Sequence, residues 1–474
     1  MAQGMEAGLD RFFKPRSIAV IGASREAGKV GNAVCENLLR GTTKEILHAR
    51  GFGGAIYPVN PRADEIMGLK CYSSIKDVPG EVDLAVVVVP ARFVPTIMEE
   101  MGEKGTRAAV IISAGFSESG EEGARLEREV LRIASKQGIR IIGPNCLGVI
   151  RTHNHLNASF ADMMPEPGPI SFVSQSGALC TAVIQYSFEE SIGFSNFVSI
   201  GNKADVDDAD LLEYFASDEE TQAIALYIES LKDGRRFMEA AKKTVPEKPV
   251  VILKSGRTEA GARATSSHTG SLSGSDAAYE AAFRQTGALR VYTIMELFDA
   301  AKALAYQPPA KGDRIAVVTN AGGPGVMAAD QLYTRGLRLA ELPKDVVKEL
   351  DSFLPPAWSR SNPVDILGDA TPERYGETLR VLSGCEEVDG IVVILTPQVM
   401  TRPMETARIV VESVRGVRKP VTAAWVGLSG RPSEDYLDSE GIPELTFPER
   451  AADAMAALVH RGRVLRRIQG GEWS

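Results

Sequence analysis

The stretch SIAVIGASREAGKVGNAVCENLL (residues 17–39) begins with a short β-branched apolar run, turns at glycine and serine, and ends in a helical pattern. The same pattern recurs along the chain, for example at 83–90 (DLAVVVVP), 108–116 (AAVIISAGF) and 314–336. Continuous apolar strands that alternate with helices are typical of a parallel sheet covered on both faces. We therefore predict an α/β protein built from doubly wound domains.

The length of 474 residues predicts more than one domain, because single cores rarely grow beyond roughly 250–300 residues. The run IRIIGPNCLGVI (139–150) closes a first unit, and the proline-rich polar run YQPPAKGD (306–313) is a candidate linker. We predict three α/β domains with the bounds 1–150, 151–305 and 306–474.

The composition excludes several classes of partner. The net charge of −9 argues against a nucleic-acid groove or an anionic membrane surface. No apolar run reaches the ~20 residues of a spanning helix, and the first 17 residues lack the apolar core of a signal peptide. The cysteines have no metal-site spacing, so we expect no metal and reduced thiols in a cytoplasm. They are Cys35, Cys71, Cys146, Cys180 and Cys385.

The first glycine loop, IGASREAGKVG (21–31), lacks the tight G-x-G-x-x-G spacing of a dinucleotide site. The second strand ends at Asn60, where a nicotinamide enzyme would place an acidic residue for the ribose hydroxyls. A dehydrogenase is therefore not favoured. The loop can still present N–H groups at a helix N-terminus to another phosphate-bearing ligand, with Lys29 placed to help. The alternative is a tight turn that binds nothing.

Two further loops join a strand to a helix through small residues. SFVSQSGAL (171–179) and VVTNAGGPGVM (317–327) both let an anion approach backbone donors at the positive end of a helix. For the first of them a plain helix cap at Ser176 is the alternative. Two such helix starts in separate domains could face one shared anion.

His268 lies in SSHTGSLSG (266–274), among small and hydroxylated neighbours that are typical of a loop. A neutral imidazole is a nucleophile near pH 7, and its attack on a phosphoryl group gives a phosphohistidine. Such a nucleophile needs an acceptor for its other ring nitrogen, and Glu229 at the end of the strand AIALYIES (223–230) is our candidate. The alternatives are a surface-loop histidine and a solvated carboxylate at a strand end.

Five motifs carry a family resemblance in their order along the chain. IIGPNCLGVI, SQSGAL, LYIES, SSHTGSLSG and NAGGPGVM resemble motifs of the nucleoside-diphosphate-forming acyl-CoA synthetases, relatives of the succinyl-CoA synthetase α subunit. The chain is most similar to the α subunits of the ADP-forming acetyl-CoA synthetases. The resemblance covers nearly the whole chain. It implies a Rossmann-like CoA-binding domain followed by two flavodoxin-like ligase domains.

The resemblance also implies roles for individual residues. His268 would be phosphorylated, Glu229 would hold its ring, and Asn145 would lie near the acyl and phosphate groups. Two helix starts would stabilise the phosphate, formed by Ser174, Gln175, Ser176 and Gly177 and by Gly322, Gly323 and Gly325. Coenzyme A would be held by Gly22, Ser24, Lys29, Gly31, Asn60, Pro90, Gly115 and Phe116.

In this family phosphate attacks the acyl-CoA thioester, the histidine takes the phosphoryl group from the acyl phosphate, and ADP then receives it. The family's nucleotide site is an ATP-grasp domain, and no segment of this sequence resembles one. We therefore expect ADP or ATP and Mg²⁺ on a separate ATP-grasp β subunit, in an α2β2 heterotetramer.

Two classes of function remain open at this point. The first is an acid–thiol ligase for acetate or another small acid. The second is a non-catalytic module that binds CoA or acyl-CoA and regulates a partner. Residue spacing defines neither the acyl group nor the choice between ADP and GDP.

Overall fold

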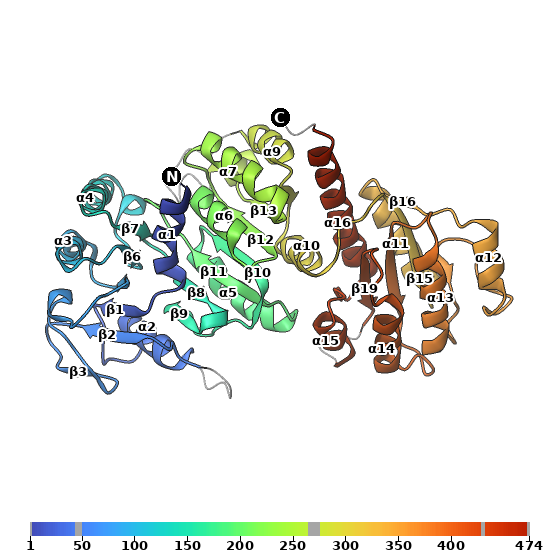
Figure 1. Cartoon of the computed structure of the whole chain (residues 1–474), viewed down its shortest axis with the longest axis horizontal. Helices are drawn as coiled ribbons and strands as arrows, with labels where there is room; N and C mark the ends of the chain where they lie inside the picture. The colour runs from blue at the N-terminus through green and yellow to red at the C-terminus, as the bar shows by residue number, and fades with distance from the viewer. Residues whose placement is uncertain (1, 43–49, 264–274, 428–431, 472–474) are drawn as a thin grey trace. The chain divides into compact units, whose positions relative to one another are not determined.

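The computed structural model describes residues 2–42, 50–263, 275–427 and 432–471, and it contains two compact units (Figure 1). The first unit is Met1–Arg290 and the second is Val291–Ser474. Three main β-sheets lie in these units, and the predicted α/β class is confirmed. Within the described ranges no helix combines the length and apolarity needed to cross a lipid bilayer.

The first sheet has five parallel strands in the order β2-β1-β5-β6-β7. Figure 1 shows α3 and α4 on one side of it and α1 and α2 on the other. The crossover helices α2, α3 and α4 lie where right-handed connections place them. The strands are β1 (Ser17–Ile21), β2 (Ala55–Val59), β5 (Leu84–Val87), β6 (Ala108–Ile111) and β7 (Arg140–Ile142). The helices are α1 (Ala2–Phe13), α2 (Val30–Arg40), α3 (Val94–Lys104) and α4 (Glu121–Gln137). Short elements are the hairpin β3 (Glu65–Ile66) and β4 (Leu69–Lys70), and the 3₁₀ turns η1 (Ile75–Asp77), η2 (Ala91–Phe93), η3 (Ser117–Ser119) and η4 (Thr152–Asn154).

The second sheet has seven strands in the order β14-β13-β12-β10-β11-β8-β9. Its centre is parallel, whereas β8 and β9 extend one edge as an antiparallel pair. The strands are β8 (Gly148–Arg151), β9 (Leu156–Ser159), β10 (Pro167–Ser174), β11 (Phe194–Ser199), β12 (Ala223–Ile228), β13 (Val250–Lys254) and β14 (Leu289–Val291). The helices are α5 (Gly177–Glu189), α6 (Asp208–Ser217), α7 (Gly234–Glu247) and α9 (Asp276–Thr286), of which the last three pack side by side.

The third sheet has the strand order β16-β15-β18-β19, with β17 paired to β15 beyond β16. Helix α11 packs against α16, and α13 packs against α14. The strands are β15 (Arg314–Thr319), β16 (Arg338–Leu339), β17 (Val364–Asp365), β18 (Gly390–Leu395) and β19 (Val421–Trp425). The helices are α10 (Ile294–Tyr306), α11 (Gly322–Thr334), α12 (Lys344–Asp351), α13 (Pro372–Gly384), α14 (Pro403–Val414), α15 (Pro432–Ser439) and α16 (Pro448–Gln469).

Two elements lie at the predicted domain bounds. Strand β8 spans the predicted bound at 150/151. It pairs with β11 and therefore belongs to the second sheet. Helix α10 ends at the predicted bound at 305/306 and packs against α16, within the compact unit that begins at Val291. The bounds 1–150, 151–305 and 306–474 themselves stay a prediction.

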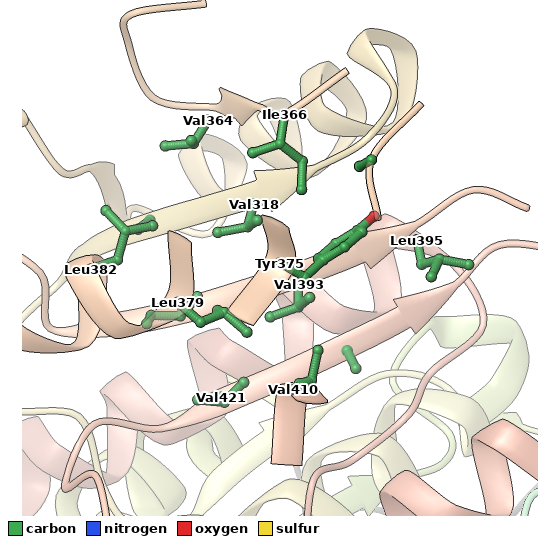
Figure 2. Packing of buried hydrophobic residues seen from close by; sticks show 14 of the residues in the cluster. Val318, Val364, Ile366, Tyr375, Leu379, Leu382, Val393, Leu395, Val410 and Val421 are labelled. Atoms are coloured by element: carbon green, nitrogen blue, oxygen red, sulfur yellow. The ribbon is translucent and has the colours of Figure 1, made fainter. Parts of the chain in front are cut away.

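Tyr375 of α13 carries a hydroxyl group into the core of the third sheet (Figure 2). Its ring is fully buried among Val318, Val393 and Leu379, and its hydroxyl donates a hydrogen bond of 3.0 Å to the carbonyl oxygen of Ile394. The polar tip of the ring is thus satisfied by the strand that the helix covers, which removes the cost of burying it.

Helix α2 begins in direct contact with the turn after β1. A Cβ atom added at Gly31 would lie 2.1 Å from the carbonyl oxygen of Gly22, closer than any real contact allows. Gly22 itself has a φ of +95°, which favours glycine. These two glycines let the start of the helix approach the carboxyl end of the strand.

A polar cluster joins the first two sheets. The side-chain amide of Asn202, which follows β11, donates to Ser117 Oγ (3.1 Å), Glu118 Oε2 (2.6 Å) and Glu127 Oε2 (3.0 Å). Glu118 Oε1 also accepts from the backbone N–H of Gly115 at 2.6 Å. Partial burial works to raise the pKa of Glu118, but the hydrogen bonds from Asn202 and the backbone outweigh it and hold the pKa below its usual value.

Replacing Gly31 by alanine should lower the unfolding free energy by about 1–3 kcal/mol, because the new methyl group forces α2 away from β1. Chemical denaturation followed by circular dichroism measures this change. The control is Gly234→Ala at the start of α7, where a Cβ atom meets nothing within 4 Å and the change should stay within about 0.5 kcal/mol. Equal effects of the two substitutions would contradict the close approach.

Replacing Glu118 by glutamine should destabilise the fold by about 1–3 kcal/mol near neutral pH, because an amide group would face N–H donors. A carboxyl whose native pKa is lowered adds stability above its unfolded pKa, and this stability is lost as the pH falls through the native pKa. The difference between wild type and Glu118→Gln should therefore shrink as denaturation is repeated at increasingly acidic pH. Glu129→Gln, on the exposed side of α4, should show no such trend.

Candidate functional site

A cavity of about 620 Å³ lies in the first unit, where the carboxyl ends of β5 and β6 meet the N-terminus of α5. Carboxyl ends of parallel strands are the usual ligand position in open α/β sheets. Five predicted site residues line this cavity: Pro90, Asn145, Gln175, Ser176 and Gly177. The apolar part of the wall includes Val30, Val89, Ile112 and Phe160. The five predicted residues come from segments next to two sheets and lie up to 87 positions apart in the sequence, from Pro90 to Gly177.

Helix α5 presents its first turn to the cavity. Ser176 caps the helix, and its Oγ accepts from the backbone N–H of Leu179 at 3.3 Å. Gly177 and Ala178 follow it and line the cavity. The first turn of a helix has N–H groups without intrahelical partners, so this end can bind an anion. Ser174 is buried and shapes the turn, since its Oγ accepts from the N–H of Ser176 at 3.0 Å.

Gln175 connects the cavity wall to the backbone of the turn that carries Glu229, the predicted catalytic residue. Its Oε1 accepts from the backbone N–H groups of Glu229 (3.0 Å) and Ser230 (3.1 Å). Its Nε2 donates to the carbonyl oxygen of Ser230 at 2.9 Å and to Asp208 Oδ1 at 3.3 Å. Glu229 is buried, with 8% of its surface exposed. One amide side chain therefore holds the turn after β12 beside the turn after β10.

A buried ion pair also contacts the turn after β12. Lys203 Nζ lies 2.6 Å from Asp208 Oδ2 and also donates to the carbonyl oxygen of Ser230. Both side chains are almost fully buried. Lys203 and Asp208 are absent from the predicted set, because NKADVDDAD has the composition of a solvated loop. The one feature of the sequence that could have indicated their burial is that these charges follow the apolar strand β11.

Asn145 lies in the connection that leads from the first sheet to the second. Its φ is +57°, a conformation that asparagine tolerates better than most residues. Its backbone N–H donates to Ser113 O at 3.0 Å, and its Nδ2 donates to Asn202 Oδ1 at 3.3 Å. Asn145 is thus fixed to the first sheet by its backbone and to the second by its side chain.

The residues of the first glycine loop lie at the carboxyl ends of β1 and β2. Asn60 Nδ2 donates to Ala23 O at 2.8 Å, so this side chain holds the loop in place. Ser24 Oγ accepts from the N–H of Glu26 at 3.0 Å. Lys29 is exposed and lies 3.8 Å from Glu26. Of this loop, Val30 reaches the wall of the cavity, which makes the two regions continuous.

Gly115 and Phe116 differ in what they can offer a ligand. Gly115 has a φ of +105° and lies in the turn after β6, next to Ala114 of the cavity wall. The side chain of Phe116 is fully buried in the core of the first sheet. Phe116 can therefore contact a ligand only through its backbone.

The third glycine loop opens helix α11 in the second unit. A Cβ atom at Gly325 would lie 2.8 Å from Thr319 Cγ2, so this glycine lets the helix pack on β15. Gly322 and Gly323 have more room. His268 lies outside the described residues. The sharing of one anion by α5 and α11, and the roles of His268 and Glu229, stay predictions.

Comparison with known proteins agrees with this arrangement. Three family models match the chain: "CoA binding domain" at 16–152, "Succinyl-CoA ligase like flavodoxin domain" at 167–304 and "Ligase-CoA domain" at 315–466. The matches cover the three sheets in turn and confirm the predicted fold.

Curated relatives extend over almost the whole chain. The acetate–CoA ligase (ADP-forming) II subunit alpha of Pyrococcus furiosus is 48% identical over 96% of this chain and 98% of its own length. The acetate–CoA ligase (ADP-forming) I of Archaeoglobus fulgidus is 46% identical over 95% of this chain, which spans 63% of that relative. Among solved structures, acetyl-coenzyme A synthetase 1 of Ca. Korarchaeum cryptofilum, in complex with phosphate and ADP, has a TM-score of 0.91 at 39% identity over 98% of both chains. The resemblance carried by the five motifs is confirmed, and the chain belongs to the family of ADP-forming acetate–CoA ligase α subunits, within the nucleoside-diphosphate-forming acyl-CoA synthetases.

Proposed function

We propose that this chain is the α subunit of an acid–thiol ligase that interconverts acyl-CoA, ADP and phosphate with a carboxylic acid, ATP and CoA. The acid is acetate or another small acid. The observation that carries the proposal is the cavity that joins the strand ends of the CoA-binding domain to the N-terminus of α5, in a chain matched along its length by acetate–CoA ligases. These names favour the ligase over a non-catalytic CoA-binding module.

The cavity suits the reactive end of an acyl-CoA. Its volume lies within the usual range of small-molecule sites, which are mostly apolar with a few placed polar groups. Val30, Val89 and Ile112 offer apolar contact to the pantetheine arm. The start of α2 and the exposed Lys29 suit the phosphates of the CoA nucleotide.

The first chemical step takes place at the start of α5. A phosphate oxygen attacks the thioester carbonyl carbon, the C–S bond breaks, and CoA leaves as the thiolate while the acyl phosphate forms. Negative charge develops on the carbonyl oxygen and is already present on phosphate. The N–H groups at Gly177 and Ala178 and the Asn145 amide stabilise both charges.

The second step transfers the phosphoryl group to His268. A ring nitrogen attacks phosphorus, the bond from phosphorus to the acyl oxygen breaks, and the carboxylate leaves. Glu229 accepts a hydrogen bond from the other ring nitrogen, which directs the attacking lone pair. In the last step the phosphoryl group passes from His268 to ADP.

The nucleotide step belongs to a second polypeptide in this proposal. An ATP-grasp β subunit holds ADP or ATP with Mg²⁺, and two copies of each subunit form an α2β2 heterotetramer. The support is that two relatives matched over nearly their full length carry the name of an α subunit. All five cysteines are free and buried, which is consistent with a reducing cytoplasm.

Introducing a carboxylate at Ala178 should weaken phosphate use without weakening the fold. Ala178 is the second residue of α5, where a negative side chain is favourable to the helix but repels an anionic ligand. We expect Ala178→Glu to raise the KM for phosphate at least tenfold in acyl phosphate formation, and thermal unfolding to be unchanged. Ala178→Gln has nearly the same size and no charge, and it should retain most of the activity. Equal KM values for the two variants would contradict an anion site at α5.

His268→Ala should abolish phosphorylation of this subunit. The purified chain is mixed with the ATP-grasp partner, Mg²⁺ and ATP labelled in its γ-phosphate. Label on the wild-type chain should be acid-labile and base-stable, as expected for a phosphoramidate. Label that persists in His268→Ala would place the nucleophile elsewhere. Glu229→Gln should label far more slowly than wild type.

A further inference from the structure

Lys254 is a buried lysine at the end of β13 that has no role in the steps above. Only 3% of its surface is exposed. Its register partner in the parallel ladder is Ile228, the last residue of β12 and the residue before Glu229. Lys254 and Glu229 therefore lie at the same edge of the second sheet, at the ends of two adjacent strands.

The ammonium group of Lys254 is held in a fixed position. Its Nζ donates to the carbonyl oxygen of Ser255 and lies 4.6 Å from the centroid of the Tyr279 ring, a favourable cation–π distance. The hydroxyl of Tyr279 accepts from the backbone N–H of Leu231 at 3.1 Å. One aromatic side chain thus connects the ammonium to the turn that carries Glu229.

Nearby carboxylates already have cationic partners. Asp208 pairs with Lys203 at 2.6 Å, and Asp276 pairs with Arg290 at 2.5 Å. In the part of the chain that the structure describes, no carboxylate forms an ion pair with Lys254. Burying a charged ammonium group in this way is unfavourable unless a nearby negative charge compensates for it.

The electrostatics of Lys254 include Glu229. Burial lowers the pKa of Lys254 below its usual value, while the carboxylates of Asp276 and Glu229 act in the opposite direction. Glu229 also contributes to the raised pKa of Tyr227, after burial. The titratable and charged groups around this pair are Lys203, Asp208, Tyr227, Asp276, Tyr279 and Arg290.

We propose that Lys254 is a positioning residue for Glu229, supplying the fixed positive charge that keeps this carboxylate ionised when a phosphoryl group arrives. The inference rests on the proposed function, in which Glu229 holds the phosphorylated histidine. An incoming phosphoryl group carries negative charge and raises the pKa of a nearby carboxyl group, whereas a nearby cation lowers it. Lys254 offsets the first effect without touching the substrate.

The test measures the pH dependence of single-turnover phosphorylation in the complex with the ATP-grasp partner. Lys254→Met removes the charge and the hydrogen bond to Ser255, Lys254→Gln removes the charge but keeps a donor, and Lys254→Arg keeps the charge. We expect the acidic limb of the rate profile to move to higher pH by about one to two units in both neutral variants, and to stay in place in Lys254→Arg. Two neutral variants keep the test usable if one of them does not fold.

The matched control is Lys419→Met in the second unit. Lys419 is a half-buried lysine that donates to the carbonyl oxygens of Leu382 and Cys385, so it loses contacts of the same kind. Its pH profile should coincide with that of wild type. If the neutral Lys254 variants lower the rate at every pH but leave the acidic limb in place, the role of Lys254 is overturned, and the proposed function is not affected. Absence of His268 label in the wild-type complex would overturn the proposed function and this role with it.

Discussion

The side-chain amide of Gln175 is the interaction on which the proposed site depends. It fills the space between the turn after β10 and the turn after β12, and it uses both its oxygen and its nitrogen there. It thereby adds a side-chain connection between the start of α5 and the turn that carries Glu229, which follow adjacent strands. Three of its hydrogen bonds are to backbone N–H and carbonyl groups, and Asp208 is its side-chain partner, so the geometry that it imposes depends little on the rotamers of other side chains.

The charged groups beneath the site follow the same logic of local compensation. Lys203 and Asp208 form a close pair; Lys203 also donates to the carbonyl oxygen of Ser230, and Asp208 accepts from the side-chain amide of Gln175. A buried ion pair contributes little net stability, but removal of one partner leaves an uncompensated charge and is costly. Such a network fixes one arrangement of the turn rather than adding to the stability of the fold.

Much of the fold is predictable because parallel strands are continuous apolar runs. The stretches at 17–21, 84–87 and 108–111 are strands in the structure, with every residue buried. The antiparallel pair β8 and β9 is harder to assign, since its residues continue from the apolar end of the first sheet and find their partners in the second. Sheet membership depends on hydrogen bonds between distant segments, which a local pattern does not contain.

The site is predictable in part, for similar reasons. Small residues at strand ends point to Ser176 and Gly177, which do line the cavity. The local sequence does not indicate that Phe116 packs into the core or that Lys203 and Lys254 are buried, because burial is a property of the assembled fold. The chain passes from β7 to β8 through residues 143–147, three of which form part of the cavity wall. The width of the cavity is therefore tied to the spacing of the two sheets, and a ligand of fixed size that fills it acts as a spacer between them.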